Sequence, residues 1–304
     1  MDTNTLISEF KTLYGDSGEE GYVYFSPGRV NLIGEHTDYN GGFVFPCALS
    51  FGTFLLIRKS HDDNVKFASI NQDFKVEIAL DKLTERQGQE WVNYPLGVIE
   101  QFIKRGIKIN NGYEMLFWGN VPTGAGLSSS ASIEVVTAFA LNELLNIKLS
   151  RTELALLSQK AENEFVGVNC GIMDQFASAM GKEDHAIFLN CDTLEFDLVP
   201  AKLDGIKVII SNTNSPHKLD AGQYNQRVAE CKEAVKEISK VKPINSLGEL
   251  RLDDFKKLED SIEDPIAKKR ARHVVSEIQR TIDAVSALKA NEIETFGKMM
   301  NASH

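Results

Sequence analysis

The stretch EMLFWGNVPTGAGLSSSAS, residues 114–132, contains a strand, a glycine-rich loop and the beginning of a helix. Residues 114–118 have the apolar and aromatic character of a strand, and apolar residues recur at helical spacing from Ala131 onward. Gly124 and Gly126 allow positive φ and close approach of the backbone. Serines at the start of a helix offer hydroxyls and unpaired N–H groups, and the helix dipole also attracts anions. The segment therefore predicts a phosphate-binding loop, with a plain glycine–serine turn as the alternative.

Two well-known phosphate motifs do not fit this segment, which we call the serine loop (residues 121–132). The P-loop requires a lysine directly after its second glycine, whereas Ala125 follows Gly124. The dinucleotide motif requires Gly or Ala where Ser129 stands, and an acidic residue at the end of a following strand. Glu143 falls within helical spacing instead. The serine loop therefore indicates a different kind of nucleotide site.

Around the serine loop, strands precede helices and both then recur, which predicts an α+β fold rather than a regular βαβ array. Strands are predicted at residues 22–25, 51–58, 65–70, 74–80, 114–118, 186–189, 194–198 and 206–211. Helices are predicted at residues 6–14, 91–105, 131–145, 150–164 and 170–180, and a long one follows Asp264 and Pro265. The stretch near Pro200 predicts a junction, with domains at residues 1–200 and 201–304.

The composition is that of an ordinary packed protein, with 304 residues of which 42% are hydrophobic and 25% charged. A net charge of −10 argues against binding to nucleic acid or to an anionic membrane surface. No apolar run approaches the ~20 residues of a membrane helix, and the N-terminus lacks the pattern of a secretory signal. The four cysteines contain no CxxC pair, which favours reduced thiols over disulfides or a zinc site. We expect a cytoplasmic protein.

A second polar segment, GRVNLIGEHTDYNGG at residues 28–42, is called the acidic loop here. It contains Arg29, Glu35, His36 and Asp38. Carboxylates and an imidazole accept hydrogen bonds from hydroxyls, and neighbouring hydroxyls of a sugar can share one carboxylate. The loop therefore predicts a sugar or polyol site. A metal site is less well supported because Glu-His-x-Asp matches no metal motif, and a solvated surface loop is the remaining alternative.

The third segment, AENEFVGVNCGIMDQ at residues 161–175, contains Glu162, Glu164 and Asp174. Asp174 follows Gly171 and lies among apolar residues at the start of a predicted helix. A carboxylate in such a place is prone to partial burial and needs a partner such as an arginine. Two interpretations stay open on this segment: a functional carboxylate, or one that only interacts with the helix dipole.

Taken together, the three segments resemble the GHMP family of small-molecule kinases, and within it the branch that phosphorylates galactose. The acidic loop is similar to the signature of that branch, GLSSSAS to the family's ATP loop, and CGIMDQ to the segment with its catalytic aspartate. The resemblance extends over essentially the whole chain. It implies two α+β domains with the active site in the cleft between them. The family's third glycine-rich motif is missing and the chain stops at His304 within a predicted helix, so we expect a fragment with an incomplete second domain.

The resemblance also implies a reaction: ATP-dependent phosphorylation of α-D-galactose at the C1 hydroxyl, giving galactose 1-phosphate and ADP. Asp174 would be the general base, and Arg29 would hold it ionised and stabilise charge on the transferring phosphoryl group. The implied sugar-binding residues are Glu35, His36, Thr37, Asp38, Gly171 and Tyr224. The implied ATP-binding residues are Ser69, Gly124, Ala125, Gly126, Leu127, Ser128, Ser129 and Ser130, and Mg²⁺ would be held by Ser130 and Glu162.

Two related functions compete with this one. A kinase for N-acetylgalactosamine would need room beside C2 of the sugar. A ligand-sensing regulator of the same family would bind galactose and ATP without turnover. Such a regulator can lack residues of the serine run, whereas Ser128, Ser129, Ser130 and Asp174 are all present, which favours catalysis. Galactose and ATP are the expected partners of a monomer that binds neither nucleic acid nor membrane.

Overall fold

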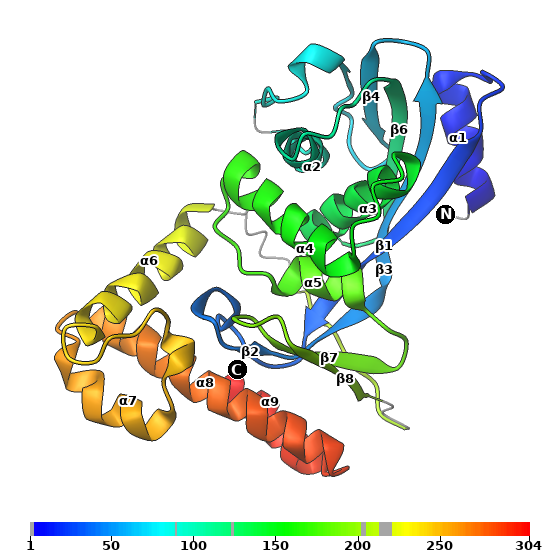
Figure 1. Ribbon diagram of the computed structural model, residues 1–304. Helices are drawn as coiled ribbons and strands as arrows, with labels where there is room; N and C mark the ends of the chain where they lie inside the picture. The colour runs from blue at the N-terminus through cyan, green and yellow to red at the C-terminus, as the bar shows by residue number, and fades with distance from the viewer. Residues whose placement is uncertain (1–2, 89, 123–124, 202–204, 213–220) are drawn as a thin grey trace. The chain divides into compact units, whose positions relative to one another are not determined.

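The computed structural model describes residues 3–88, 90–122, 125–201, 205–212 and 221–304 (Figure 1). These residues form two compact units that combine helices and sheets. Unit 1 comprises Met1–Gly28 and Leu49–Gly167, and unit 2 comprises Arg29–Ala48 and Val168–His304. The acidic loop, except its first residue, therefore belongs to unit 2, although unit 1 segments flank it in sequence. The domains at residues 1–200 and 201–304 stay a prediction.

Unit 1 is built on a five-stranded sheet with the strand order β1-β3-β6-β4-β5. Its strands are β1 (Gly21–Asn31), β3 (Pro46–Ser60), β4 (Asn64–Ser69), β5 (Val76–Ala79) and β6 (Gly112–Gly119). β6 is antiparallel to β3, with Phe54 opposite Trp118, and parallel to β4, with Ser69 opposite Phe117. Because β6 is the central strand, its C-terminal end leads from the middle of the sheet into the serine loop.

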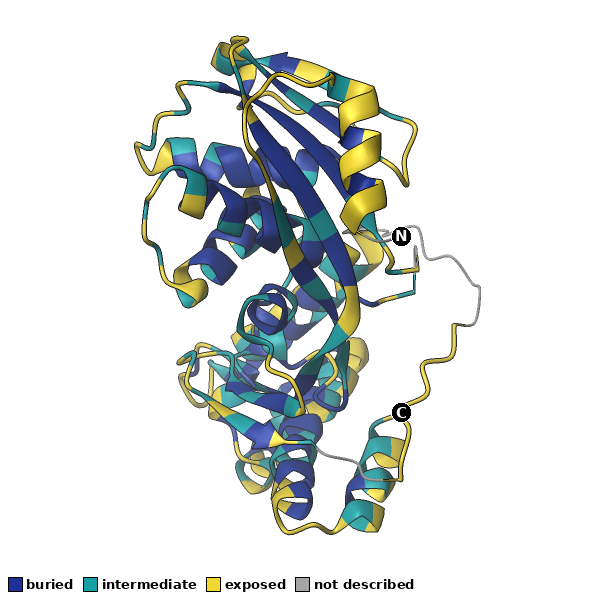
Figure 2. Cartoon of the chain, turned by 90° about the vertical axis from the view of Figure 1, so that its right-hand side faces the viewer, coloured by how far each residue is buried: buried dark blue, intermediate teal, exposed yellow. Residues whose placement is uncertain are grey.

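Helices cover both faces of this sheet, because successive side chains of a strand point to opposite sides. They are α1 (Thr3–Tyr14), α2 (Asn93–Lys104), α3 (Ser129–Leu144) and α4 (Arg151–Lys160). Leu55 lies in the larger core, which includes residues of α2, α3 and α4. Its neighbour Leu56 lies in a smaller core with Leu6 and Phe10 of α1. Figure 2 shows the resulting pattern, in which most residues of the sheet are buried or half-buried and α1 is largely exposed.

Unit 2 combines a small antiparallel sheet, in the order β2-β7-β8, with helices. Its strands are β2 (Phe43–Val44), β7 (His185–Asn190) and β8 (Phe196–Pro200), and its helices are α5 (Met173–Met180), α6 (Ala221–Ile238), α7 (Leu252–Leu258), α8 (Pro265–Lys289) and α9 (Ile293–Ser303). The long helix α8 packs against α6, α9 and β2. Asp264 caps its start by accepting hydrogen bonds from the N–H groups of Ile266 and Ala267, as the Asp-Pro pair predicts.

The α+β class is confirmed, but α6, α7 and β2 were not predicted, and three predicted elements differ clearly from the structure. The helix predicted at residues 150–164 begins with the expected capping box, but α4 ends at Lys160 and a π-helical turn, Ala161–Val166, follows. The helix predicted at residues 170–180 begins only at Met173. Residues 206–211, predicted as a strand, have no regular structure and expose Ile206, Val208 and Ile209. A strand requires a partner for its backbone groups, and no described strand pairs with this run.

Candidate functional site

The centre of the site in unit 2 is an ion pair between Arg29 and Asp174. Nε and Nη2 of Arg29 donate hydrogen bonds to Oδ1 and Oδ2 of Asp174, and the donor–acceptor distance is 2.9 Å in each. Arg29 comes from β1, and Asp174 lies in the first turn of α5, where the helix dipole favours a negative charge. The planar guanidinium matches the carboxylate with two parallel hydrogen bonds, which fixes the orientation of both groups. Asp174 thus has the arginine partner that its sequence context required.

A second carboxylate, Asp38, lies close to this pair in a different environment. Burial raises the pKa of Asp38 to about 7, and the negative charge of Asp174 adds to the rise, whereas the backbone N–H of Tyr39 and the charge of Arg29 oppose it. Gly171 directly contacts the carboxylate: a Cβ there would lie 2.1 Å from Oδ2 of Asp38. Only glycine fits this position, so Gly171 and Asp38 form one wall of the site.

Aromatic and imidazole rings form a neighbouring cluster in unit 2. The hydroxyl of Tyr39 lies 2.9 Å from Nδ1 of His36, and the ring of Tyr224 on α6 is centred 5.4 Å from the ring of Tyr39. Burial lowers the pKa of His36, and the positive charges of His273 and Arg227 lower it further. Burial raises the pKa of Tyr224, and the charge of Asp38 contributes. The cluster therefore presents a neutral imidazole and protonated hydroxyls beside the carboxylates.

The other residues of the acidic loop differ in their contacts. Glu35 is exposed, and its Oε1 accepts a hydrogen bond of 2.9 Å from Nδ2 of Asn31. Thr37 is buried, with its hydroxyl 2.9 Å from the carbonyl oxygen of Gly34 and 2.7 Å from that of Phe43. The Thr37 side chain thus stabilises the loop itself, and its assignment to sugar binding stays a prediction.

The serine loop of unit 1 packs against β1. A Cβ at Gly28 would lie 2.5 Å from the carbonyl oxygen of Leu127, so glycine is required for this close approach. Ser128, with φ of 58°, precedes the first residue of α3. The start of α3 is anchored by Ser132. Its hydroxyl donates a 2.7 Å hydrogen bond to the carbonyl of Ser26 and accepts a 3.0 Å hydrogen bond from the N–H of Thr53.

The predicted ATP-binding residues other than Ser69 lie in this same segment, at residues 124–130. Gly124 lies outside the described residues. Ser129 is exposed and Ser130 half-buried in the first turn of α3, where backbone N–H groups have no helical acceptor. A helix start of this kind attracts an anionic group. The described part of the loop therefore has the polarity that a phosphate chain requires.

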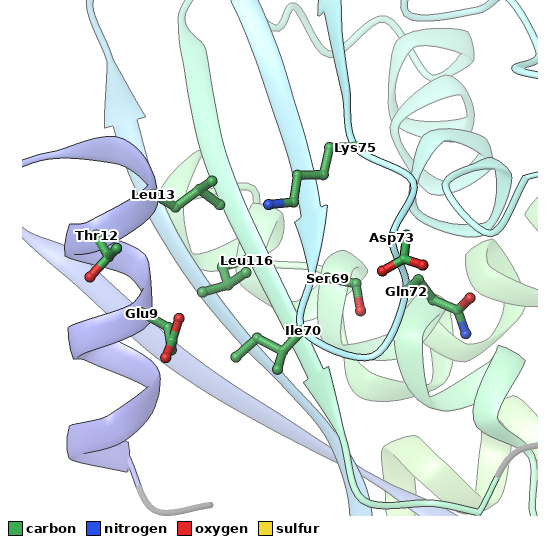
Figure 3. A pocket seen from close by; sticks show the side chains of 9 residues that line it. All are labelled: Glu9, Thr12, Leu13, Ser69, Ile70, Gln72, Asp73, Lys75 and Leu116. Atoms are coloured by element: carbon green, nitrogen blue, oxygen red, sulfur yellow. The ribbon is translucent and has the colours of Figure 1, made fainter.

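Ser69, at the C-terminal end of β4, lines a separate feature of unit 1. It borders a cavity of about 470 Å³ together with residues of α1, including Glu9 and Leu13 (Figure 3). The hydroxyl of Ser69 accepts the N–H of Asn71 over 3.1 Å. Its predicted role near a nucleotide stays a prediction.

The metal assignment rests on oxygen donors in unit 1. Glu162 is buried within the π-helical turn after α4, and Ser130 lies in the first turn of α3. Carboxylate and hydroxyl oxygens suit Mg²⁺, which also keeps several waters and binds substrate phosphates. Among the described residues no group of three or more His, Cys, Asp or Glu could hold a metal alone. These donors therefore fit a metal shared with a phosphate better than a protein-only site.

Sequence reasoning missed two residues of α8 that contact the acidic loop. Glu277 accepts hydrogen bonds from the backbone N–H groups of Gly34 and Glu35, and His273 contacts the carbonyl oxygen of Glu35. The apolar stripe of this helix predicted packing only. The polar residues between its apolar positions gave no signal, because their partners lie more than two hundred positions away.

Among the described residues, no helix combines the length and apolar character needed to span a bilayer.

Comparison with known proteins gives consistent matches. Residues 8–59 match the galactokinase galactose-binding signature, and residues 93–182 match the N-terminal domain of GHMP kinases. The chain is 50% identical to the galactokinases of Clostridium beijerinckii and Clostridium acetobutylicum, covering 99% of this chain and 77% of each relative.

Solved structures agree with the sequence matches. The crystal structure of Lactococcus lactis galactokinase complexed with galactose has a TM-score of 0.92 and 42% identity, covering 99% of this chain and 78% of that one. A D-glycero-D-manno-heptose 1-phosphate kinase from Bacteriodes thetaiotaomicron matches with a TM-score of 0.60 at 14% identity, covering 91% of this chain and 76% of that one. The second likeness concerns the fold alone. The chain spans about three quarters of the length of the curated relatives.

Proposed function

The chain belongs to the galactokinase family of GHMP kinases, and from this premise we propose that it phosphorylates α-D-galactose at the C1 hydroxyl with ATP as donor. The products are galactose 1-phosphate and ADP. The observation that carries the assignment to particular residues is the bidentate Arg29–Asp174 pair, with Asp38 and Gly171 beside it. These groups provide an oriented carboxylate, a positive charge and further hydrogen-bond acceptors in one small region of unit 2.

The sugar is recognised by acceptors on the acidic loop. Glu35 and Asp38 accept hydrogen bonds from sugar hydroxyls, and His36 and Tyr224 form the neighbouring wall. The lowered pKa of His36 supports a neutral ring, which can both donate and accept. Thr37 and Gly171 complete the set, Thr37 by stabilising the loop and Gly171 by leaving room beside Asp38. A sugar with several hydroxyls fits this mixture of acceptors and rings better than an apolar ligand does.

Asp174 acts as the general base that takes the proton from the C1 hydroxyl. Its pairing with Arg29 fixes the carboxylate in one orientation, as proton abstraction requires. The guanidinium also stabilises the negative charge on the phosphoryl group during transfer. Phosphoryl transfer depends mainly on positioning and charge stabilisation, and an oriented carboxylate–arginine pair contributes to both.

ATP is the co-substrate, and residues 124–130 of the serine loop with Ser69 are proposed to bind it. The N–H groups and hydroxyls at the start of α3 bind phosphate oxygens. Ser130 and Glu162 are proposed to hold Mg²⁺, which neutralises phosphate charge when bound. We place the reaction in the cytoplasm and propose a monomer that binds neither nucleic acid nor membrane, in line with the net charge of −10.

The test is an assay of ADP release with and without galactose, on the wild-type chain and on Asp174→Asn. We expect galactose-dependent ADP release by the wild-type chain and a loss of at least about a hundredfold in the variant, because general-base catalysis contributes on this scale. Asp197→Asn, which alters an exposed carboxylate of the same unit, serves as the control and keeps full activity. Galactose binding without ADP release in the wild-type chain would favour a sensing regulator, and turnover of N-acetylgalactosamine alone would favour the sister kinase.

A further inference from the structure

The peptide unit on each side of Glu35 is held by a side chain of α8. Oε1 of Glu277 lies 3.3 Å from the backbone N of Glu35 and 3.0 Å from that of Gly34. Nε2 of His273 lies 2.9 Å from the carbonyl oxygen of Glu35. A carboxylate and a carbonyl oxygen only accept, so the N–H groups donate to Glu277 and the imidazole donates to the carbonyl. Four positions separate the two side chains, which places both on the same face of the helix.

Glu277 is itself held firmly. It is 0% exposed, pairs through Oε2 with Arg280, and accepts a hydrogen bond from the hydroxyl of Ser303 on α9. A buried carboxylate with this set of donors is satisfied and has one preferred orientation. Helices α8 and α9 therefore provide a rigid support for the acidic loop.

The loop needs such support because its backbone is unusual on both sides of Glu35. Gly34 has φ of 101°, and a Cβ there would lie 2.8 Å from the carbonyl oxygen of Phe43. His36 has φ of 63°, a left-handed conformation that residues with side chains rarely adopt. A strained backbone persists only where surrounding contacts hold it in place. Loss of the α8 contacts would let the loop relax and displace the Glu35 carboxylate and the His36 ring.

We propose that His273 and Glu277 are positioning residues for sugar binding: they hold the backbone on both sides of Glu35, so that Glu35 and His36 are already in place before galactose binds. This inference rests on the proposed function, since it gives the two loop residues their ligand. Neither α8 side chain belongs to the Arg29–Asp174 pair. Their effect is therefore on galactose affinity rather than on the phosphoryl-transfer step, because ordering a binding loop in advance reduces the cost of binding.

The experiment compares His273→Ala, His273→Gln and Gln279→Ala in the 304-residue chain by calorimetry with galactose, and by separate measurement of KM and kcat. His273 is half-buried and lies outside the apolar clusters, so its removal leaves the core intact, whereas removal of Glu277 would also break the contact with Ser303 of α9. We expect His273→Ala to weaken galactose binding about threefold to tenfold, the scale of one hydrogen bond, with kcat and the KM for ATP within about twofold. The amide of Gln can donate to the same carbonyl, so His273→Gln restores most of the affinity. Gln279 of the same helix lies two positions from Glu277, so its side chain points away from the acidic loop and donates to Asp283 instead, and Gln279→Ala keeps wild-type affinity.

The remaining outcomes separate this inference from the proposed function. A wild-type chain that binds no galactose overturns the proposed function, and the inference with it. Wild-type binding of galactose together with unchanged affinity in His273→Ala overturns the inference alone. Equal loss in His273→Ala and His273→Gln, or a parallel loss of ATP affinity, also overturns it, because both would mean that the ring acts through general stability.

Discussion

At the scale of single residues, Asp38 and Asp174 show how two neighbouring carboxylates differ. Asp174 is paired with Arg29 in a bidentate geometry, whereas Asp38 is half-buried beside that charge and desolvation raises its pKa to about 7. The folded value lies above the unfolded value of 3.8, so the stabilising contribution of Asp38 is complete only below pH 3.8 and is lost as pH rises through 7. Above pH 7 the protein therefore contains a poorly solvated carboxylate that costs stability.

The corresponding prediction concerns Asp38→Asn. At pH 8 the free energy of unfolding of the variant should be about 1–3 kcal/mol larger than that of the wild-type chain, because a neutral amide replaces a charge that is poorly solvated in the folded state. The gain should be much smaller at pH 5, where the wild-type carboxyl is protonated in the folded state. Urea unfolding at both pH values measures the effect. Equal differences at pH 5 and pH 8 would contradict the assigned cause, and galactose binding should be lost at both.

The residue types of this site were predictable, but their surroundings were not. The resemblance of the acidic loop and the CGIMDQ segment to a known family implied that Arg29, Asp38 and Asp174 belong to one site, whereas the segment of Asp174 alone left its role open. The close approach of Gly171 to Asp38 depends on how α5 meets the acidic loop, and no local pattern contains that information. For the same reason the α8 residues that hold Glu35 were found only in the structure.

At the scale of elements, α1 is fixed to the sheet by a buried ion pair. Nε of Arg58 on β3 donates a 2.9 Å hydrogen bond to Oε2 of Glu114 on β6. Its Nη1 donates a 3.2 Å hydrogen bond to the carbonyl of Gly15, the residue just after α1. The guanidinium also lies 5.0 Å from the centre of the Phe10 ring. Both side chains are buried; Glu114 also lies 3.5 Å from Nζ of Lys66, whereas Glu114 is the carboxylate that pairs with Arg58 among the described residues.

We predict that Glu114→Gln lowers the free energy of unfolding by about 3 kcal/mol, because it leaves Arg58 as a buried and poorly paired charge. The double variant Arg58→Met, Glu114→Leu should lose less of the free energy of unfolding, since it removes both charges and fills the space with apolar side chains. Glu77→Gln, which alters an exposed carboxylate on β5 at the edge of the same sheet, is the control. Urea unfolding measures the free energy of unfolding of each variant. A double variant less stable than Glu114→Gln would contradict the prediction that the unpaired Arg58 charge causes the loss of stability.

Elements were predictable where periodicity and capping agree. The apolar alternation of β3 and β6 and the Ser150–Glu153 capping box identified their elements correctly. Residues 206–211 have the composition of a strand, yet pairing is a property of two strands, and composition describes only one. The end of α4 was misplaced because a π-helical turn continues the apolar pattern without the α-helical hydrogen bonds.

At the scale of the whole molecule, residues 206–210 expose four large apolar side chains, those of Ile206, Val208, Ile209 and Ile210. Ile209 is 82% exposed, and the run has neither helical nor strand structure. Thermolysin, which cuts before bulky apolar residues, should therefore cleave first within residues 206–210, because proteases act on exposed and unpaired backbone. Mass spectrometry of a short digest identifies the site. Replacing Ile206, Val208, Ile209 and Ile210 with serine should abolish the early cut, and first cleavage within α8 or β6 would contradict the prediction.

The membership of residues 29–48 in unit 2 has a consequence for synthesis on the ribosome. This segment emerges early, yet the helices that support it are encoded near the other end of the chain. Arg29 can pair only after Asp174 has been synthesised, and Gly34 only after Glu277, whereas all residues of unit 1 have been synthesised once Gly167 is reached. The nascent chain therefore carries the acidic loop without these contacts until Glu277 has been synthesised, and neither unit is encoded as one uninterrupted stretch.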